Sequence, residues 1–398
     1  MSADSAEVLI LGAGIAGCAL AYHLAGKDVG PVAVYDPRTP GAGATGRAAG
    51  IVTEQLWNRW DVEVTRESKE QYAALSARWD PSAYTVNGFV RWAHGSEATG
   101  VLESAIGRLR TWGVDVREIA VDELRQRVPW GRFDDGPRAV WSPADAVVTP
   151  STMGEIYAEG ARQAGVDFVL GTPMDALLRV AGRWELATGG RTLRARNAVV
   201  AAGAWSKQLL RGIGHPLPLA PYRTQAAVLR PASGPVVFPS VHDIDVDVYA
   251  RPEANGRILA GDGTRLVEVD PETFRPGADE SFVTQLAETF ERRFPGWADA
   301  EMVRAWAGVC TSTPDRRPLV GPVAREENLY AIVGFNGFGV MRAGGVALRL
   351  ADLLASGGDG AREVERLRPV LPTRFGDDAG AFLPRPGFTL DDGDDPRF

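Results

Sequence analysis

Cysteine is nearly absent from this sequence. Its 398 residues include two cysteines, Cys18 and Cys310, which are too few for a framework of several disulfide bonds. Small secreted proteins that depend on such a framework are therefore excluded, and a reducing, cytoplasmic location is expected. Lysine is also scarce, whereas arginine is abundant. The three lysines are Lys27, Lys69 and Lys207.

Long apolar runs and an excess of positive charge are missing as well. No stretch of 18 apolar residues occurs, so we expect no membrane-spanning helix. The apolar segment 8–24 lacks the basic residues that precede such a segment in a signal peptide. A formal net charge of −8 disfavours nucleic acid and anionic membranes as main partners. With 45% hydrophobic and 24% charged residues, the chain is typical of a globular protein large enough for two domains.

The strongest pattern lies near the N-terminus, where residues 8–17 read VLILGAGIAG. Four apolar residues predict a buried parallel strand, and the glycines that follow match the G-x-G-x-x-G turn of dinucleotide-binding proteins. A helix predicted over 15–24 directs its N-terminal N–H groups at a diphosphate. The next strand, 32–35, leads to Asp36, whose carboxylate is expected to accept a hydrogen bond from a ribose hydroxyl. This unit does not by itself distinguish NAD from FAD.

A loop of small residues follows the second strand, over 37–50 (PRTPGAGATGRAAG). Small side chains let a ligand lie against backbone N–H groups, and Thr45 and Arg47 add a hydroxyl and a cation. The position of the loop favours a cofactor-binding role over an ordinary surface loop. The same combination of apolar strand and small residues recurs at 197–205 (NAVVAAGAW) and at 329–341, where a strand leads into GFNGFGVM.

These stretches make the chain resemble the D-amino-acid oxidase, sarcosine oxidase and glycine oxidase family of FAD-dependent amine oxidoreductases. Residues 43–50 fit the family pattern G-A-S/T-x-x-A-A-G, 201–205 fit its second FAD signature, and 313–321 (TPDRRPLVG) fit T-P-D-x-x-P-x-[IV]-G. The likeness covers about residues 6–375. It implies an α/β fold in which a Rossmann-like FAD-binding domain carries a second, mixed-sheet α+β substrate domain. Asp36 stands where these proteins more often have glutamate.

The order of the predicted elements indicates how the two domains interleave. We expect the FAD-binding domain to comprise residues 1–83, 141–215 and 305–375, and the substrate domain residues 84–140 and 216–304. Residues 376–398, rich in Asp, Gly and Pro, are predicted to form a C-terminal tail. Residues 84–92 (YTVNGFVRW) are interpreted as two strands joined by an Asn-Gly turn. Helices are predicted over 151–165, with Ser151 as its N-cap, and over 343–354.

The resemblance implies that FAD contacts the glycine-rich turn, the loop after the ribose acid, the two later small-residue stretches and one residue beside the adenine. The residues expected to bind FAD are Gly12, Ala13, Gly14, Ile15, Ala16, Gly17, Asp36, Pro37, Arg38, Gly43, Ala44, Thr45, Arg47, Ala48, Ala49, Gly50, Met174, Ala202, Gly203, Trp205, Gly334, Phe335, Asn336, Gly337, Phe338, Gly339, Val340 and Met341. The flavin is expected to be non-covalent, because the cysteine that some sarcosine oxidases attach to FAD aligns with Gly308 and not with Cys310. No metal site is predicted.

The reaction that the resemblance implies is the oxidation of a C–N bond. A hydride moves from the carbon beside a neutral amine to flavin N5, and the imine is then hydrolysed. The expected partners are a small-molecule amine substrate and, for reoxidation, molecular oxygen or another electron acceptor. Glu54, Gln55 and Trp57 follow the diphosphate loop and are candidates for lining the substrate cavity, whereas the four histidines match no motif. The candidate catalytic residues are Tyr249, Cys310, Asn336 and Met341.

Two further expectations concern cations that family members have and this chain lacks. Sarcosine-oxidase-type members use a lysine near the flavin to attract oxygen, and no lysine follows Lys207, so slow reoxidation by oxygen is expected. Many members hold a substrate carboxylate with an arginine before T-P-D or a lysine after the glycine loop, where this chain has Cys310 and Met341. Either another arginine replaces that cation, with Arg251 and Arg342 nearest by position, or the substrate is an amine with apolar surroundings.

Three other interpretations use the same residues. A flavin-dependent aromatic hydroxylase shares the fold but normally carries G-D-A-x-H near the last strand, where this chain has GFNG at 334–337. An NAD(P)-dependent dehydrogenase shares the first βαβ unit but does not need the later loops. A non-catalytic flavin-binding protein is an alternative that the sequence does not distinguish.

Overall fold

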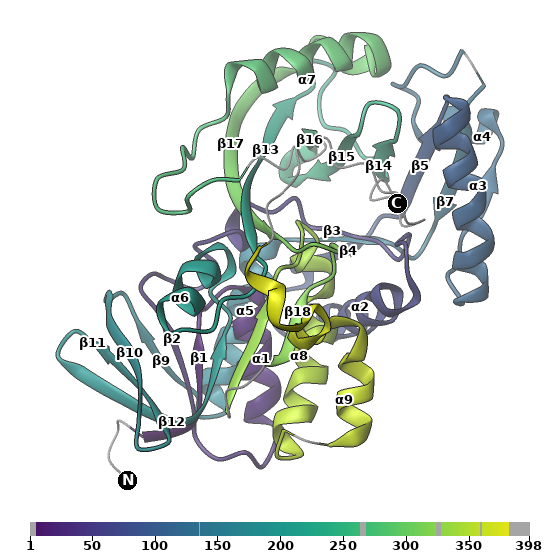
Figure 1. Ribbon diagram of the computed structural model, residues 1–398. Helices are drawn as coiled ribbons and strands as arrows, with labels where there is room; N and C mark the ends of the chain where they lie inside the picture. Colours follow the sequence, from purple (N-terminus) through teal and green to yellow (C-terminus); the bar gives the residue numbers. More distant parts are fainter. Residues whose placement is uncertain (1–4, 135, 263–267, 324–327, 359, 382–398) are drawn as a thin grey trace.

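The computed structural model describes residues 5–134, 136–262, 268–323, 328–358 and 360–381. Two large sheets, one above the other in Figure 1, dominate the molecule. The predicted tail lies mainly outside the described residues, because only its first six positions, 376–381, are included. Within the described ranges, no helix combines the length and the apolar character that crossing a membrane requires.

The lower sheet in Figure 1 is mixed, with a parallel centre. Its strands are β1 (Ser5–Leu11), β2 (Val32–Asp36), β9 (Asp167–Leu170), β10 (Met174–Val180), β11 (Arg183–Thr188), β12 (Arg191–Val200), β18 (Leu319–Pro322) and β19 (Leu329–Val333). The strands β9, β2, β1, β12 and β19 are parallel and pair in that order. One edge of β12 pairs with two strands in turn: its first half pairs with β11, and its last residues pair with β19. β10 then pairs antiparallel with β11, and β18 pairs antiparallel with β19.

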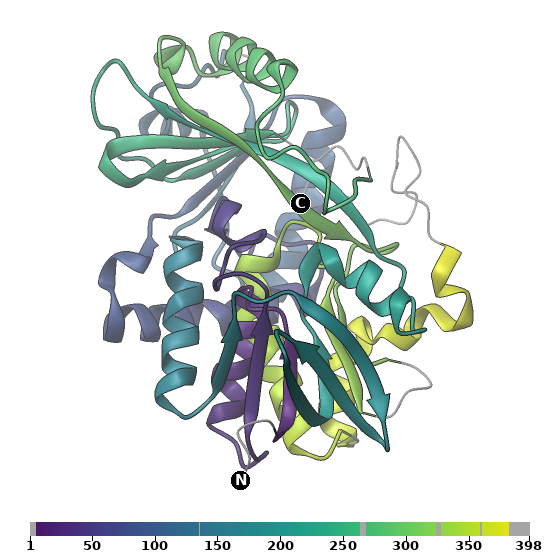
Figure 2. The same cartoon turned by 90° about the vertical axis from the view of Figure 1, so that its left-hand side faces the viewer.

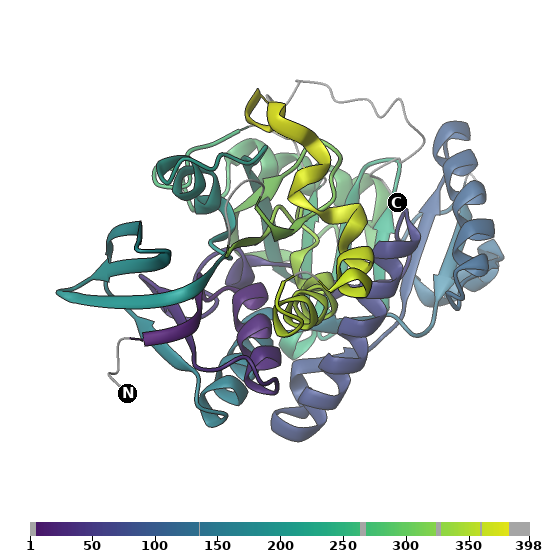
Figure 3. The same ribbon diagram turned by 60° about the horizontal axis from the view of Figure 1, so that its bottom comes forward.

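The central strand β1 is apolar because both of its faces are covered. Val8 and Ile10 pack into a cluster with helices, whereas Leu9 and Leu11 belong to the cluster on the opposite face. Burial of each such side chain contributes about 2 kcal/mol relative to its exposure. Four helices of the first face pack on one another (Figure 3). They are α1 (Ile15–Ala25), α2 (Arg59–Trp79), α5 (Pro150–Gln163) and α8 (Gly339–Ala355).

The upper sheet has the strand order β17-β13-β16-β15-β14-β5-β7-β6. Its strands are β5 (Phe89–Ala93), β6 (Arg117–Ile119), β7 (Arg138–Ser142), β13 (Ala220–Arg230), β14 (Ser240–Asp243), β15 (Val248–Glu253), β16 (Arg257–Asp262) and β17 (Glu301–Ser312). Helices α4 (Val121–Arg127) and α7 (Glu280–Arg293) cover one face, and α3 (Ser96–Thr111) packs against β5 and β7. The long strands β13 and β17 run from this sheet down toward the lower one (Figures 1 and 2).

A three-stranded sheet lies between the two large ones in Figure 1 and corrects one prediction. It consists of β3 (Ile51–Val52), β8 (Ala146–Val148) and β4 (Tyr84–Val86). Residues 84–92 therefore do not form a hairpin, because β4 pairs with β8 whereas β5 joins the upper sheet. Asn87 and Gly88 carry the chain from one sheet to the other, and their N–H groups donate to the carbonyl of Asp145 at 3.2 and 2.8 Å.

Two predicted helix starts are also wrong. Helix α5 begins at Pro150 with Thr149 as its N-cap, so Ser151 lies inside the helix. Helix α8 begins at Gly339, four residues before the predicted start, so Met341 belongs to its first turn. The other α-helices among the described residues are α6 (Ser206–Gly212) and α9 (Ala361–Leu367).

Candidate cofactor and substrate site

The site begins where β1 and β12 end side by side. In the sheet, β2 and β9 lie on one side of β1, whereas β12 and β19 lie on its other side, so the strand order reverses here. In open α/β sheets, ligands bind outside the carboxyl ends of strands at such a point. Gly12 has φ +123°, and a Cβ on it would lie 2.4 Å from the carbonyl oxygen of Ala201. Only glycine fits this close approach of the two strand ends.

The other two glycines of the turn have different surroundings. A Cβ on Gly17 would lie 1.9 Å from the carbonyl oxygen of Gly12, so this glycine lets α1 approach the strand closely. Gly14 has one neighbour, Thr45 Oγ1 at 3.6 Å, within 4 Å of its missing Cβ. Gly14 lines a cavity, whereas Ala13 and Gly17 shape the turn from behind. The open front of Gly14 is the space that a diphosphate requires.

Asp36 and Thr45 hold the turn in this shape. Asp36 accepts hydrogen bonds from the backbone N of Ala13 at 2.8 Å and from that of Arg38 at 2.9 Å. Thr45 Oγ1 accepts from the backbone N of Ile15 at 3.0 Å. Asp36 and Thr45 also line the cavity. The ribose contact expected of Asp36 stays a prediction.

Arg47 stabilises the small-residue loop in a way that the sequence did not reveal. Its guanidinium donates to the carbonyl oxygens of Ala42 and Gly43 at 2.6 and 3.1 Å. The indole N–H of Trp306 on β17 donates to the carbonyl oxygen of Arg47 at 3.0 Å. The loop is therefore fixed both to itself and to the upper sheet, while Arg47 and Trp306 line the cavity.

One cavity of about 1620 Å³ joins these elements to the upper sheet. It exceeds the roughly 300–1,000 Å³ of a typical small-molecule pocket, which suits a dinucleotide together with a substrate. All predicted cofactor residues except Ala13 and Gly17 line it, and so do all four candidate catalytic residues. Trp57 lines it as well, whereas Glu54 and Gln55 do not.

Glu54 and Gln55 point instead into a buried polar network. Glu54 lies 2.8 Å from the ammonium of Lys69 and 2.7 Å from the guanidinium of Arg66. The Gln55 amide nitrogen donates to the hydroxyl of Ser142 at 2.9 Å. The prediction that these two residues line the cavity is wrong, because their side chains lie in this network and not in the cavity wall.

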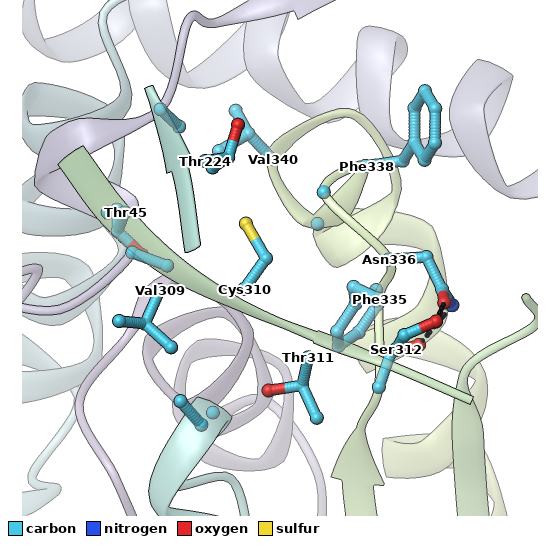
Figure 4. A pocket seen from close by; sticks show the side chains of 18 of the residues that line it. Thr45, Thr224, Val309, Cys310, Thr311, Ser312, Phe335, Asn336, Phe338 and Val340 are labelled. Carbon is cyan, nitrogen blue, oxygen red and sulfur yellow. Dashed lines mark hydrogen bonds between the residues drawn. The ribbon is translucent and has the colours of Figure 1, made fainter. Parts of the chain in front are cut away.

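Cys310 points into the cavity from β17, on the side of Thr224 and Val340 (Figure 4). It lies opposite Tyr222 in the pairing of β13 with β17. Burial raises the pKa of Cys310 to about 11 and the pKa of Tyr222 well above its usual value. Both groups are therefore neutral at physiological pH. This wall is uncharged at the position where many family members have an arginine.

Asn336 fastens two of the predicted motifs to each other. Its side-chain oxygen accepts from the hydroxyl of Ser312 at 2.9 Å and from the backbone N of Thr313 at 3.1 Å (Figure 4). Its amide nitrogen donates to the carbonyl oxygen of Gly334 at 2.6 Å. These bonds join the T-P-D segment to the GFNGFG loop. They indicate a positioning role for Asn336, and its expected catalytic role stays a prediction.

The two arginines suggested as replacement cations lie outside the cavity lining. Arg342 is fully buried, forms an ion pair with Asp61 and donates to the carbonyl oxygen of Phe335 at 2.6 Å. Arg251 forms an ion pair with Glu253 at 2.9 Å. Neither arginine is placed to hold a substrate carboxylate in the cavity.

Sequence reasoning missed several polar residues that line the cavity from the upper sheet and its loops, among them Arg91, His242 and Asp247. Arg91 lies on β5, and His242 on β14 lies 2.9 Å from a carboxylate oxygen of Asp247. Pairing between strands about 150 residues apart brings Arg91 and His242 together, so no local motif marks them. The one available signal was a charged residue within the apolar strand 89–93 (FVRWA).

The strand order, the glycine-rich turn and the cavity define a dinucleotide-binding protein with the expected α/β architecture. The chain belongs to the family described as FAD dependent oxidoreductase, whose model matches residues 7–353. FAD is therefore the cofactor of this family, and the open front of Gly14 and the small residues that line the cavity fit it.

The comparisons with individual proteins agree with this family. Dimethylglycine dehydrogenase from Rattus norvegicus is 25% identical over 374 residues, which cover 89% of this chain and 43% of the rat protein. Glycine oxidase from Pseudomonas aeruginosa is 28% identical over 362 residues, or 88% of this chain and 95% of that protein. The chain thus spans less than half the length of the mammalian dimethylglycine dehydrogenases it matches.

Solved structures show the same fold. L-proline dehydrogenase from P. horikoshii matches with a TM-score of 0.84 at 24% identity, covering 94% of this chain and 98% of that one. Glycine oxidase from Geobacillus kaustophilus matches with a TM-score of 0.82 at 23% identity, covering 93% and 99%. The predicted Rossmann-like FAD-binding part with a second mixed sheet is confirmed, whereas the domain boundaries stay predictions.

Proposed function

We propose that this chain oxidises a C–N bond of an amino-acid-like amine with FAD as its cofactor. The observation that carries the proposal is the single cavity in which the glycine-rich turn, the small-residue loops and the upper sheet meet. Bound FAD supplies the hydride acceptor. The electrons then pass to molecular oxygen or another acceptor.

The chain's own residues would orient the amine and keep water away from it. Tyr249 faces the cavity from β15, Cys310 from β17 and Met341 from the first turn of α8. Their neutral side chains offer no charge that would stabilise a protonated amine, and hydride loss requires the neutral form. Holding the amine carbon in a fixed place against the cofactor replaces a random encounter by an oriented one.

The substrate class is supported by the names of the relatives. Those proteins are described as acting on glycine, dimethylglycine, sarcosine or L-proline, which are all small amino acids or N-methylated amino acids. We therefore propose a small amino acid, with or without N-methyl groups, as substrate. The hydroxylase alternative has less support, because residues 334–337 are GFNG where hydroxylases normally carry the start of G-D-A-x-H. Asn336 of this segment forms hydrogen bonds within its own loop.

The proposal is tested by turnover of glycine, sarcosine, L-proline and D-alanine with a redox dye and, separately, with air. We expect amine-dependent dye reduction together with a carbonyl or cyclic imine product. The rate with air should be lower than the rate with dye, because no lysine lines the described part of the cavity. The matched control replaces each amine by its hydroxy acid, which carries no C–N bond to oxidise. Dye reduction that needs NADPH and a phenol instead of an amine would reject the proposal in favour of a hydroxylase.

A further inference from the structure

A row of side chains crosses the upper sheet and faces the cavity. Arg91 on β5 pairs in register with His242 on β14, His242 with Tyr249 on β15, and Tyr249 with Gly261 on β16. Residues at one register position of neighbouring strands point to the same face of a sheet. Arg91, His242 and Tyr249 accordingly all line the cavity.

Gly261 gives Tyr249 its place in this row. A Cβ on Gly261 would lie 2.2 Å from the hydroxyl oxygen of Tyr249, so the tyrosine side chain lies across the glycine. Any larger residue at 261 would displace the ring. Tyr249 therefore leans away from Arg91 along the sheet, and the two side chains mark opposite ends of the row.

Arg91 is the buried cation at one end. It is 4% exposed, and its Nη1 donates to the carbonyl oxygen of Gln55 at 2.6 Å. Burial lowers the pKa of Arg91 to about 10, although Asp145 and Asp247 act in the opposite direction. The guanidinium is still charged at neutral pH. A buried cation in a cavity wall gains from an anionic ligand that replaces its lost hydration.

The two carboxylates that attract Arg91 are shared with other groups. Asp145 lies 3.2 Å from the ammonium of Lys69, and Asp247 lies 2.9 Å from Nε2 of His242. Each negative charge is therefore divided between two partners. Arg91 lines the cavity with His242 beside it in the sheet, whereas Lys69 does not line the cavity. The other arginines of the lining, Arg38, Arg47, Arg108 and Arg316, lie outside this row of the upper sheet.

We propose that Arg91 binds the carboxylate of the substrate and so supplies the cation that is missing at Cys310 and Met341. The substrate class is then an amino acid with a free carboxylate, held between Arg91 and the neutral wall of Cys310 and Tyr249. A decarboxylated amine or an ester of the same amino acid is discriminated against. This inference rests on the proposed function, whose substrate it specifies.

The test measures binding of non-reactive carboxylates to the FAD-loaded protein. Methoxyacetate and tetrahydrofuran-2-carboxylate resemble sarcosine and proline, but an ether oxygen replaces the amine nitrogen, so neither forms an imine. Their Kd values are obtained from the change that they cause in the visible flavin spectrum. Arg91→Gln should raise both values about 10- to 100-fold, the size expected for a charge-assisted hydrogen bond, and Arg91→Lys should raise them less. The methyl esters should bind wild type and Arg91→Gln equally.

Arg230→Gln is the matched control, because Arg230 lies on β13 of the same sheet in an exposed ion pair with Glu301. It should leave both Kd values within a factor of two. Where Arg91→Gln does not retain FAD, Arg91→Lys and the comparison of acid with ester in the wild type carry the test. Equal binding of acids by wild type and Arg91→Gln, or equal binding of acid and ester by the wild type, would overturn the proposal.

The binding test separates this inference from the proposed function. Binding of methoxyacetate needs no turnover, so a protein that oxidises no amine but loses the probe in Arg91→Gln would reject the proposed function alone. A protein that oxidises sarcosine and its methyl ester equally well, with KM unchanged in Arg91→Gln, would reject the role of Arg91 alone.

Discussion

At the scale of single residues, Gly14 tests the cofactor site most sharply. Gly14→Val places a branched side chain in the open space before the turn, where the diphosphate is expected. The variant should purify without yellow colour, whereas the wild type should be yellow and release FAD into the supernatant on acid precipitation. Gly107→Val is the control, because Gly107 lies on the exposed side of α3 with no atom within 4 Å of its missing Cβ.

Two results would contradict this account of the site. A Gly14→Val protein as yellow as the wild type would show that the cofactor does not lie against the turn. Yellow colour that stays with the acid-precipitated wild-type protein would show a covalent flavin. That result would contradict the expected non-covalent binding, which rests on the alignment of the attachment cysteine with Gly308 instead of Cys310.

The residues that sequence alone could find share one property. Gly12, Gly14 and Asp36 stand within 25 positions of one another, because one βαβ unit brings a whole phosphate site together. Arg91 and His242 could not be found in this way, since their neighbourhood depends on the pairing of β5 with β14. The sequence therefore predicted much of the cavity lining but not these two residues of the upper sheet.

At the scale of elements, α3 depends on a carboxylate from a distant loop. The side-chain oxygens of Asp245 accept from the backbone N of His94 at 2.6 Å and of Gly95 at 2.8 Å, at the start of α3. Burial alone would raise the pKa of Asp245, but the hydrogen bonds from His94 and Gly95 lower it overall. A capping carboxylate of this kind contributes about 1 kcal/mol.

Asp245→Ala should therefore reduce the free energy of unfolding by about 1 kcal/mol near pH 7. Because the pKa is lower in the folded state, the contribution is present above the unfolded-state pKa of about 4 and is lost as the pH falls through the folded value. Urea unfolding near pH 7 and near pH 3 measures both predictions. Asp122→Ala, which removes an exposed ion pair with Arg125, should change stability by less than about 0.5 kcal/mol. A cost of Asp245→Ala that grows toward low pH would contradict this role.

The elements also show where local patterns mislead. Residues 84–92 have the composition of a hairpin, yet β4 and β5 pair with strands of different sheets, because long-range pairing outweighs a local turn preference. The start of α8 differs from the prediction for a related reason. Glycine is a poor helix former, so its propensity favours a loop at Gly339, yet the helix begins there in the packed structure.

At the scale of the whole molecule, the two large sheets have separate roles. The lower sheet ends in the turn and the loops that suit a dinucleotide, and the upper sheet contributes Arg91, His242 and Tyr249. Neither sheet alone encloses the cavity. The proposed function therefore depends on how the two sheets are arranged around the cavity. Composition and motifs alone did not predict this arrangement, which followed from the family resemblance.

The central claim is that an amine reduces a flavin held in this cavity. It is tested most directly by mixing the purified yellow protein with sarcosine or L-proline in the absence of oxygen and recording the visible spectrum. The account predicts loss of the flavin absorbance with amine alone, slower with the methyl ester than with the acid. A spectrum that no amine changes, while dithionite bleaches it fully, would contradict the account.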